Sequence, residues 1–429
     1  MFPITAARCK IKKRINPSAL AINGGPKVRL KPLPGRGLLG PEEKAAVDAL
    51  FDEAIASGEA FGYNGPAEEE YCREFTEFMG GGYADAVNSG TSGVYVALHA
   101  LNPEPFTEII VSPITDCGGM MPITLLNCIP IIADTEPNSY NTGPDQIEKL
   151  ISPLTSAILV AHIGGEPADI KGIVAVAKKH HIPVIEDCAQ SPGAKINGRL
   201  VGTFGKIASF STMFGKHFCT GGQGGMVYTE NEDLYWKSRQ VSDRGKPFGL
   251  PTGSTNSIAS LNFNLDDLAA TIGRVQLKKL PGILAKRRKI VAQLREEFKK
   301  LRVVSIPTVP DDTHPAYWFL RLRFHPETVT CDKETYCQSL TAEGMPVNPN
   351  YNALPHTYDW YKNRSVFGTS GYPWTSPRYK GDPNQQFPCP NARAAISRHF
   401  NLGISESWSN KDVASITAAL KKTESVFLK

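Results

Sequence analysis

Hydrophobic residues in the middle of the chain form short runs of the length that suits buried strands. Several runs are nearly continuous in Ile, Val and Ala, as expected for strands covered on both faces of a mostly parallel sheet. Helical stretches such as GIVAVAKKHH separate some of them. The pattern therefore predicts a large α/β domain. Its strands between residues 107 and 229 would be TEIIVSPIT, CIPIIADT, SAILVAHI, IPVIEDC, KIASFST and GGMVYT.

Helical spacing of apolar positions appears on both sides of this region. Residues 41–58 and the stretch AEEEYCREFTEFMGG predict two helices before it. After it, LDDLAATIGRVQLKKLPGILAKRRKIVAQLREEFKKL predicts a long helix that is broken or kinked around Pro281. YWFLRLRF predicts a strand, and CDKETYCQSLTAEG and NKDVASITAALKKT predict helices. Residues 345–390, rich in Pro, Tyr, Asn and Trp, predict an irregular excursion.

The chain divides accordingly into three parts. We expect a mobile N-terminal segment over residues 1–20, a large domain over residues 21–264 and a smaller α+β domain over residues 265–429. The length supports more than one core, because single cores stop growing at about 250–300 residues and this chain has 429.

Charge and composition argue against several classes of protein. The formal charge of +5 comes from 47 basic and 42 acidic residues mixed along the chain, which is no footprint for nucleic acid. No apolar run approaches the roughly 18 residues that a membrane helix needs. Nine cysteines without CxxC or metal-type spacing favour reduced thiols and no metal site. The start of the chain lacks the apolar stretch of a secretory signal, although its basic residues leave an organellar leader open. We expect a cytoplasmic protein.

Three features of the α/β region carry candidate chemistry. VNSGTSG predicts a strand and a turn into a helix, whose first N–H groups near Gly90, Thr91 and Ser92 would point at an anion. Asp187 stands at the carboxyl end of a buried strand, where open α/β sheets bind ligands. Lys216 lies between two strand-like runs and ahead of a glycine cluster. Alone, each has an ordinary interpretation, as a helix cap, a solvated carboxylate and a solvated lysine.

The order of the three features predicts a site for pyridoxal phosphate. The lysine amine would form a Schiff base with the cofactor, and the aspartate would keep the pyridine nitrogen protonated so that the ring accepts electrons. The turn would hold the phosphate. It is neither GxGxxG nor GxxxxGK[ST], which disfavours a nicotinamide cofactor and a nucleoside triphosphate.

The chain also resembles a known family over roughly residues 20–425. It is similar to the DegT/StrS family of pyridoxal-phosphate sugar aminotransferases. The resemblance implies an aspartate-aminotransferase-like large domain (fold type I) with a mostly parallel sheet, and a smaller α+β C-terminal domain. The matching segments are Ser89-Gly90-Thr91, ADTEPNSYN, HIGGEPAD at residues 162–169, EDCAQ at residues 186–190, FSTMFGK at residues 210–216 and HFNLGISESWSNKDVASI.

The resemblance implies a role for each matched residue. Lys216 would be the Schiff-base lysine and proton shuttle, Asp187 would lie against the pyridine nitrogen, and Gln190 near the phenolic oxygen of the cofactor. Asn262 resembles the family asparagine that reaches the phosphate of the neighbouring subunit, which implies a homodimer with shared active sites. The residues expected to hold the phosphate are Thr91, Ser92 and Ser211, with Gly90 in the same turn.

Several positions depart from the family pattern. Asp116 stands where the family has a stacking aromatic residue, and it is either a solvent-facing carboxylate or a contact of the cofactor ring or substrate. His162 follows a buried strand and either packs against the ring or fills space. Gln223, Asn264 and Gly164 replace an acid, an arginine and a tyrosine of the family. We expect these changes to affect which substrate the protein takes more than the chemistry of the cofactor.

The favoured function is transfer of an amino group from glutamate or glutamine to a keto-sugar, which we expect to be linked to a nucleotide. Two alternatives stay open. Aligning the chain on GQGG places His217 in the lysine position, as in the sugar 3-dehydratases of the family. The altered residues also leave room for a non-enzymatic regulator that binds the cofactor or a sugar.

Overall fold

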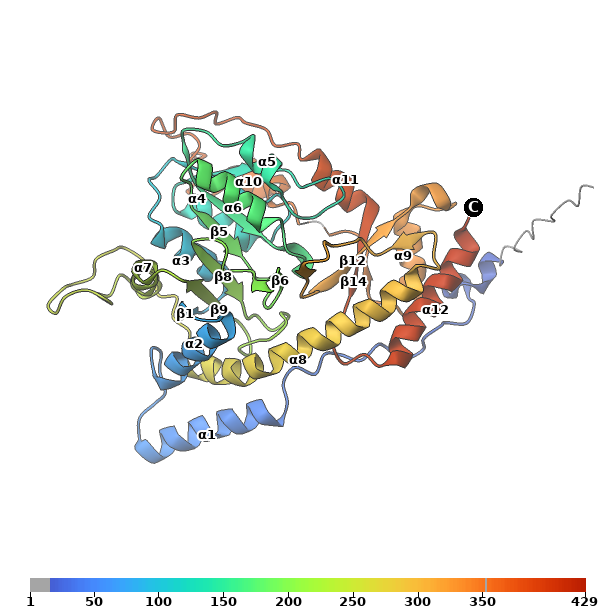
Figure 1. Ribbon diagram of the computed structural model, residues 1–429, viewed down its shortest axis with the longest axis horizontal. Coiled ribbons are helices and arrows are strands. Elements are labelled where there is room, and N and C mark those ends of the chain that lie inside the picture. The colour runs from blue at the N-terminus through green and yellow to red at the C-terminus, as the bar shows by residue number, and fades with distance from the viewer. Residues whose placement is uncertain (1–15, 352) are drawn as a thin grey trace, which may run out of the picture.

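A seven-stranded sheet organises the larger part of the molecule (Figure 1). The computed structural model describes residues 16–351 and 353–429. The strands lie in the order β1-β9-β8-β5-β4-β2-β3; neighbours from β8 to β3 are parallel, and β9 is antiparallel to both β1 and β8. The predicted mostly parallel α/β fold is confirmed. The strands are β1 Tyr83–Val87, β2 Glu108–Val111, β3 Ile129–Ile132, β4 Thr155–Ala161, β5 Val184–Asp187, β8 Ile207–Ser211 and β9 Gly225–Thr229.

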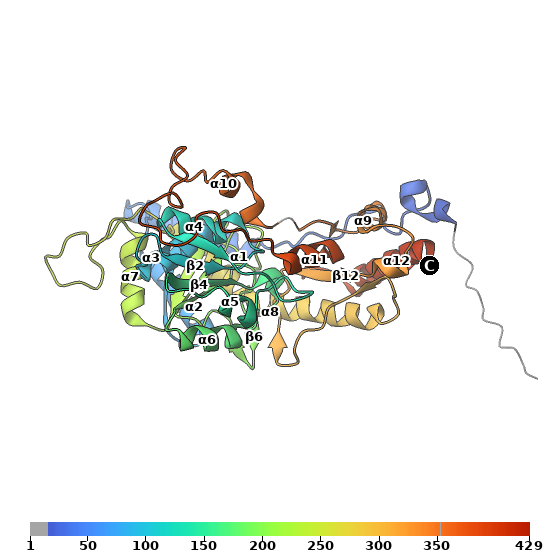
Figure 2. The same cartoon turned by 90° about the horizontal axis from the view of Figure 1, so that it is seen from above.

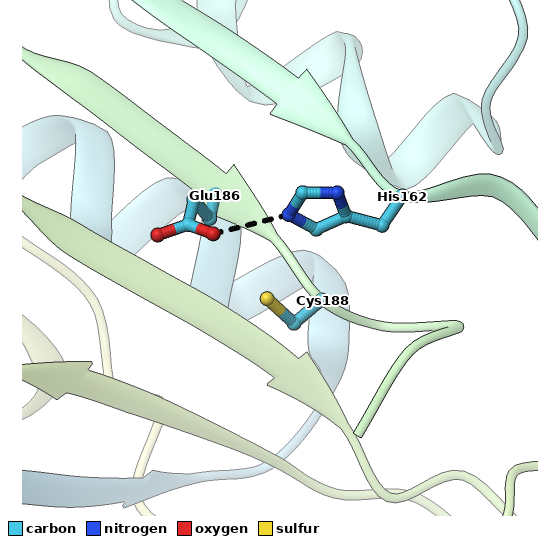
Figure 3. Close-up of side chains that lie close together, drawn as sticks. All are labelled: His162, Glu186 and Cys188. Atoms are coloured by element: carbon cyan, nitrogen blue, oxygen red, sulfur yellow. Dashed lines mark hydrogen bonds and ion pairs between the residues drawn. The ribbon is translucent and has the colours of Figure 1, made fainter. Parts of the chain in front are cut away.

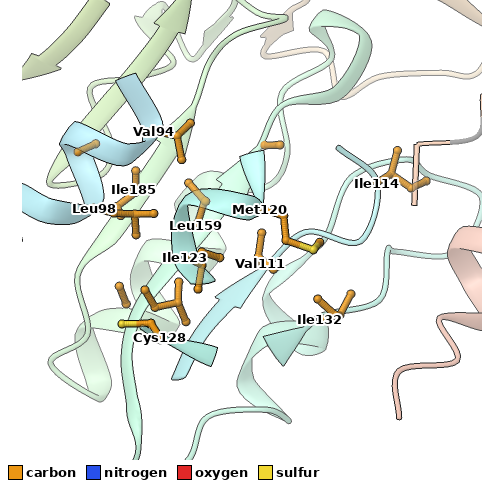
Figure 4. Close-up of a cluster of buried hydrophobic side chains, with 14 of the residues drawn as sticks. Val94, Leu98, Val111, Ile114, Met120, Ile123, Cys128, Ile132, Leu159 and Ile185 are labelled. Carbon is orange, nitrogen blue, oxygen red and sulfur yellow. The ribbon is translucent and has the colours of Figure 1, made fainter. Parts of the chain in front are cut away.

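Neighbouring residues of each central strand fill opposite faces of this sheet. Val111, Leu159 and Ile185 belong to the core under α3 and α4 (Figure 4). Ile110 and Ile158 belong to the core that includes α5 and α6. Burial on both faces explains why these strands are almost wholly apolar. The helices of this part are α1 Pro41–Ser57, α2 Pro66–Met79, α3 Gly90–Ala100, α4 Met121–Leu125, α5 Pro144–Glu148, α6 Ile170–Lys179 and α7 Glu232–Ser242.

A four-stranded antiparallel sheet, in the order β10-β12-β14-β13, forms the centre of the smaller part. α9 and α12 pack on it, and α11 leads into β14 (Figure 1). A small third sheet, β11-β6-β7, joins residues from both halves of the sequence. The elements are β6 Lys195–Ile196, β7 Arg199–Leu200, β10 Val304–Ser305, β11 Thr313–His314, β12 Phe319–Phe324, α9 Lys333–Ala342, β13 Val347–Asn348, α10 Asp359–Lys362, α11 Pro390–Arg398, β14 His399–Gly403 and α12 Asn410–Phe427.

One helix connects the two parts. α8, Asp267–Phe298, continues through Pro281, so the break considered in the sequence is absent, and Figure 1 shows one long helix. Pro281 faces solvent, while the neighbouring Leu280 and Leu284 are buried against the large part. Packing along the whole helix therefore maintains it despite the missing N–H of proline. The C-terminal half of α8 contributes Leu294 to the smaller core.

Only part of the predicted N-terminal segment belongs to the described residues. Of the predicted mobile segment 1–20, residues 1–15 lie outside the described residues. Pro17–Ala19 form a 3-10 turn, and Leu20 is fully buried. The boundaries at residues 20 and 264 stay predictions.

Two general observations concern the whole described chain. Within residues 16–351 and 353–429, none of the helices has the length and apolar character needed to cross a membrane. The eight cysteines of the described residues are all free thiols.

A pair of buried carboxylates shares one arginine beneath α2. Arg239 Nη1 lies 3.3 Å from Glu68 Oε1 and 2.9 Å from Asp85 Oδ1, and both carboxylates are at most 2% exposed. Burial, and then the charge of Asp85, raise the pKa of Glu68 to about 7. Ionising Glu68 therefore weakens the folded state.

Replacing this carboxyl group should change how stability depends on pH. Because the pKa of Glu68 is raised, wild-type stability should fall as pH rises from about 4.5 to about 7, by about 3 kcal/mol. Glu68→Gln should remove most of this fall and be more stable than wild type at pH 8. Urea unfolding at several pH values measures the effect, with the exposed neighbour Glu69→Gln as control. Parallel pH profiles for wild type and Glu68→Gln would contradict the prediction.

Candidate active site

A cavity of about 600 Å³ lies at the carboxyl ends of the parallel strands of the large sheet. Asp187 ends β5 and Ser211 ends β8, so the parallel arrangement brings these two side chains to one edge. Of the ten residues predicted for the site, seven line the cavity, namely Gly90, Thr91, Asp116, Asp187, Gln190, Ser211 and Lys216. The lining identified among the described residues does not include Ser92, His162 or Asn262.

The N-terminus of α3 opens on this cavity. Ser89 caps the helix, because its Oγ accepts a hydrogen bond from the Ser92 N–H at 3.0 Å. The Ser92 hydroxyl donates to Asn88 Oδ1 at 2.7 Å, which keeps it behind the cavity wall. The N–H groups of Gly90 and Thr91 come before the intrahelical bonds of α3. These groups and the helix dipole can hold an anion such as a phosphate.

Asp187 contributes a buried carboxylate to the cavity. It is 8% exposed, and its Oδ1 accepts a hydrogen bond from the Ala189 N–H at 3.0 Å. Burial raises the pKa of Asp187 above its ordinary value, although the Ala189 N–H and the charge of Lys216 act in the opposite direction. A buried carboxylate gains most from a cationic partner. Asp187 is therefore suited to face a protonated nitrogen.

Lys216 places its amine in the same cavity. Nζ lies 4.0 Å from the centre of the Trp318 ring, and the indole N–H donates to the Gly215 carbonyl at 3.0 Å. Burial lowers the pKa of Lys216 to about 8, although Asp187 and Asp116 favour the charged form. A useful fraction of the amine is thus neutral, and nucleophilic, near neutral pH.

The backbone on either side of this amine is held from outside the cavity. Arg36 donates to the carbonyl of Lys216 and, at 2.7 Å, to that of His217. Glu406 pairs with Arg36 at 3.0 Å and with the buried Arg287 at 2.8 Å. These contacts join Arg36 of the segment before α1, Arg287 of α8 and Glu406 of the segment before α12 at the lysine, and they fix its direction.

His217 points away from the ligand space. It is completely buried, and its Nε2 lies 3.1 Å from the Ala316 carbonyl, to which it donates. Burial, followed by the charges of Arg287 and Arg36, lowers the pKa of His217 well below its ordinary value. A neutral, buried imidazole outside the cavity favours Lys216 over His217 as the reacting residue.

Gln190 is engaged at both ends of its amide. Its Oε1 accepts from the Gly164 N–H at 2.7 Å, and its Nε2 donates to the Tyr351 hydroxyl at 3.1 Å. Gly164, where the family has tyrosine, has φ of 68°, and a Cβ there would lie 2.8 Å from the Phe319 ring. The large part and the smaller part of the molecule approach each other closely at Gly164, so this position leaves no room for a tyrosine side chain.

Asp116 is an exposed carboxylate at the cavity wall. Its Oδ1 accepts from the Gly118 N–H at 2.9 Å. A Cβ on Gly118 would lie 3.2 Å from this oxygen and 2.2 Å from Thr91 Oγ1, so the two side chains converge on the same glycine. An exposed side chain at the cavity wall agrees with both interpretations from the sequence, a solvent-facing carboxylate and a contact of a bound ligand.

His162 lies outside the cavity, in a buried cluster with Glu186 and Cys188 (Figure 3). Its Nδ1 accepts from the Ala168 N–H at 3.0 Å, so its proton is on Nε2, which donates to Glu186 Oε2 at 3.1 Å. Three backbone N–H groups of the turn 202–205 also donate to Glu186 at 2.6–2.8 Å. Burial raises the pKa of Cys188 well above its ordinary value. These engaged atoms favour a structural cluster over a metal site.

Asn262 lies on the outside of the molecule. It is exposed, and its Oδ1 accepts hydrogen bonds from the N–H and side-chain amide of Asn264 at 3.0 and 2.8 Å. It belongs to the connection between α7 and α8, which projects as a long loop (Figure 1). Its predicted contact with a neighbouring subunit's phosphate stays a prediction.

The structure adds residues to the site that no motif indicated. They come from the smaller part of the molecule and from the segment after β13, where the sequence shows only a mixture of polar and aromatic residues. The dipeptide YW before β12 is the one local signal. The added lining residues are Trp318, Asn348, Asn350, Tyr351, Ala353 and Tyr358.

Comparison with known proteins agrees with this geometry. The chain is 29% identical over 290 residues to a GDP-perosamine synthase of Caulobacter vibrioides, covering 66% of the chain and 76% of the relative. It is 28% identical over 404 residues to the spore coat polysaccharide biosynthesis protein SpsC of Bacillus subtilis, covering 90% and 95%. The X-ray structure of an aminotransferase from Psychrobacter cryohalolentis superimposes with a TM-score of 0.79 at 24% identity, covering 91% and 98%.

The family model matches residues 41–421, which include every candidate residue of the cavity. The resemblance seen in the sequence is thereby confirmed, as is the fold that it implied. The protein is an enzyme and belongs to the DegT/DnrJ/EryC1/StrS aminotransferase family.

Proposed function

We propose that the enzyme uses pyridoxal phosphate, held by Lys216, to move an amino group from glutamate or glutamine to a keto-sugar linked to a nucleotide. One observation carries this proposal. The Lys216 amine, the Asp187 carboxylate and the N-terminus of α3 all open on one cavity. A Schiff-base lysine, an acid for a pyridine nitrogen and a phosphate cradle are the three parts that such a cofactor needs.

Two glycines leave room at the wall where the phosphate of the cofactor would lie. A Cβ on Gly90 would lie 2.6 Å from Ser211 Cβ, and a Cβ on Gly118 would lie 2.2 Å from Thr91 Oγ1. Glycine at these positions leaves the two hydroxyl groups open beside the first N–H groups of α3. Together these groups offer hydroxyl and backbone donors for a phosphate. The acidic residues of the described lining are Asp116 and Asp187.

The residues of this chain then divide the work. Pyridoxal phosphate, when bound, supplies an electron sink conjugated to the reacting carbon. Lys216 binds the cofactor through its amine and moves a proton as general base and acid, for which a pKa of about 8 is well placed. Asp187 holds a proton at the ring nitrogen. Gln190, which is held by hydrogen bonds to Gly164 and Tyr351, would orient the phenolic oxygen of the cofactor.

The keto-sugar substrate is proposed from a relative and from the lining of the cavity. A relative is named GDP-perosamine synthase, a name that refers to a nucleotide-linked sugar. Asn348 and Asn350 line the cavity beside Tyr351, and such amides suit hydroxyl groups. We extend these observations to a polyhydroxylated keto substrate for this enzyme.

A homodimer is part of the proposal. Phe214, two residues before the lysine, is 67% exposed, and Leu261, beside Asn262, is 65% exposed. Large apolar side chains exposed around a site are typical of surfaces that a partner covers. A second copy would bring Asn262 to the cavity of its neighbour. We place the enzyme in the cytoplasm, where its free thiols would stay reduced.

The proposed function predicts two separable half-reactions. The purified enzyme with pyridoxal phosphate should take up nitrogen from ¹⁵N-labelled glutamate or glutamine and release the keto acid, without any sugar present. A panel of nucleotide-linked keto-sugars should then accept the label, followed by mass spectrometry. Absence of cofactor binding, or of label uptake from every donor tested, would refute the proposal.

A further inference from the structure

A second cavity, of about 550 Å³, lies between the edge strand β3 and the irregular segment around α10. Figure 2 shows α10 and the long loop after it lying over the large part of the molecule. Ile129, Pro130 and Ile131 of β3 form one wall. This cavity shares no lining residue with the active-site cavity, although Thr357 lines one and its neighbour Tyr358 lines the other.

The walls contributed by the segment are aromatic. Tyr361, Trp374, Tyr379 and Phe387 all line the cavity. Trp374 and Tyr379 are buried, Tyr361 packs on Trp374 with ring centres 5.6 Å apart, and the Tyr379 hydroxyl donates to Glu108 Oε1 at 2.9 Å. This wall is therefore fixed in place, while Tyr361 and Phe387 remain partly exposed to the cavity.

The rim of the cavity carries an excess of positive charge. Lys362, Arg364 and Arg393 line it, against one carboxylate, Asp382. Arg393 donates through Nε to the Pro388 carbonyl at 2.8 Å, which leaves its outer N–H groups available. Among the described residues, neither Lys362 nor Arg393 forms an ion pair.

One further group, His356, adds no charge to the wall. Burial, and then the charge of Arg393, lower the pKa of His356 to about 4. The imidazole is therefore neutral at pH 7. A fixed aromatic wall beside free cations is the combination that recognises a flat ring carrying a phosphate.

We propose that this cavity binds a nucleoside phosphate, with the base against Tyr361 and Phe387 and the phosphate at Lys362 and Arg393. Arginine and lysine bind phosphate oxygens by charge-assisted hydrogen bonds, and aromatic faces stack on any base. The ligand is either a free nucleotide or the nucleotide portion of a larger molecule. The inference does not rest on the proposed transamination, because its residues lie outside the active-site cavity.

Calorimetric titration of the full-length enzyme with ADP, GDP, UDP and dTDP tests this site. At least one of them should bind with one site per chain, and the double variant Lys362→Gln/Arg393→Gln should weaken it at least tenfold. The control Lys380→Gln/Arg398→Gln changes the same charge on exposed residues near the same segment, and should bind within twofold of wild type. Inorganic pyrophosphate and uridine, which lack the ring or the charge, should bind at least tenfold more weakly than the best nucleotide.

Several outcomes would overturn the proposal. They are no binding of any of the four nucleotides, equal losses in the two double variants, and pyrophosphate binding as tightly as the nucleotides. Melting temperatures of the variants within 2 °C of wild type, a threshold chosen as about the shift of a small stability change, would establish that folding is intact. If a nucleotide-linked sugar competes with the bound nucleotide, the cavity takes the nucleotide portion of that larger molecule. If the two bind at the same time, the occupant of the cavity is a free nucleotide.

Discussion

Lys216→Ala should lose transamination by at least about 10⁴-fold, because general acid–base catalysis alone contributes about 10²–10⁴ and this residue is also the proposed attachment point. Borohydride reduction of the wild type with pyridoxal phosphate, followed by peptide mapping, should place the cofactor on Lys216. The same treatment of the variant should give no modified peptide. Activity is measured as ¹⁵N transfer.

The matched control is Lys206→Ala, which removes an exposed lysine directly before the first residue of β8. It should keep activity within about twofold, as surface substitutions usually do. Cofactor found on another lysine, or activity retained by Lys216→Ala, would contradict the assignment. Cofactor binding without any modified lysine, together with loss of activity in His217→Ala, would revive the dehydratase-like alternative, because an imidazole forms no Schiff base.

Asp187→Asn should lower turnover on the order of 10²–10³-fold, as removal of one preorganised electrostatic group does in other enzymes. Asparagine keeps the shape and the acceptor for the Ala189 N–H, which Asp187 Oδ1 holds at 3.0 Å. It removes the charge that would retain a proton on the ring nitrogen. The loss should appear in turnover, measured by stopped-flow half-reactions, more than in binding of the donor.

Stability of the cofactor-free protein should move in the opposite direction. Because burial raises the pKa of Asp187, its ionised form weakens the folded state above the ordinary carboxyl pKa of 3.8. Asp187→Asn should therefore melt at a higher temperature than wild type at pH 7, and the difference should vanish below about pH 4, where the wild-type carboxyl is neutral in both states. The exposed Asp145→Asn is the control. A variant that is both inactive and less stable at pH 7 would indicate a structural role instead.

The opposing effects reflect how the site is built. A carboxylate at 8% exposure and an amine at 8% exposure are both costly to bury without a ligand. Both would gain from the proposed cofactor, which would offer Asp187 a cation and Lys216 a covalent bond. Arg36 and Glu406 hold the lysine backbone from outside, so the site keeps its shape at a cost in stability.

Much of the large part follows from local pattern. The buried runs became β2, β3, β4, β5, β8 and β9 because continuous apolar sequence fits only strands covered on both faces. Their order placed Asp187 and Ser211 at carboxyl ends on one edge, where Lys216 also lies. Thr91 followed from helix-capping residues after a short strand.

Other features required the complete molecule. Glu186 and Asp187 are neighbours in sequence, but successive side chains of a strand point to opposite faces of the sheet. His162 binds Glu186 on the other face from Asp187 and therefore does not line the cavity. α8 continues through Pro281, because packing on both halves of the helix outweighs the missing N–H of the proline. Neither result can be obtained from the residues on either side alone.

The sequence by itself determined the fold class and predicted the candidate lysine, aspartate and anion-binding turn, because each of these depends on residues a few positions apart. Only the tertiary structure decided what surrounds them. Trp318 meets Lys216 across about a hundred positions of sequence, and Arg36 meets Glu406 across most of the chain. Such contacts depend on how two sheets and one long helix pack, and no local periodicity records that.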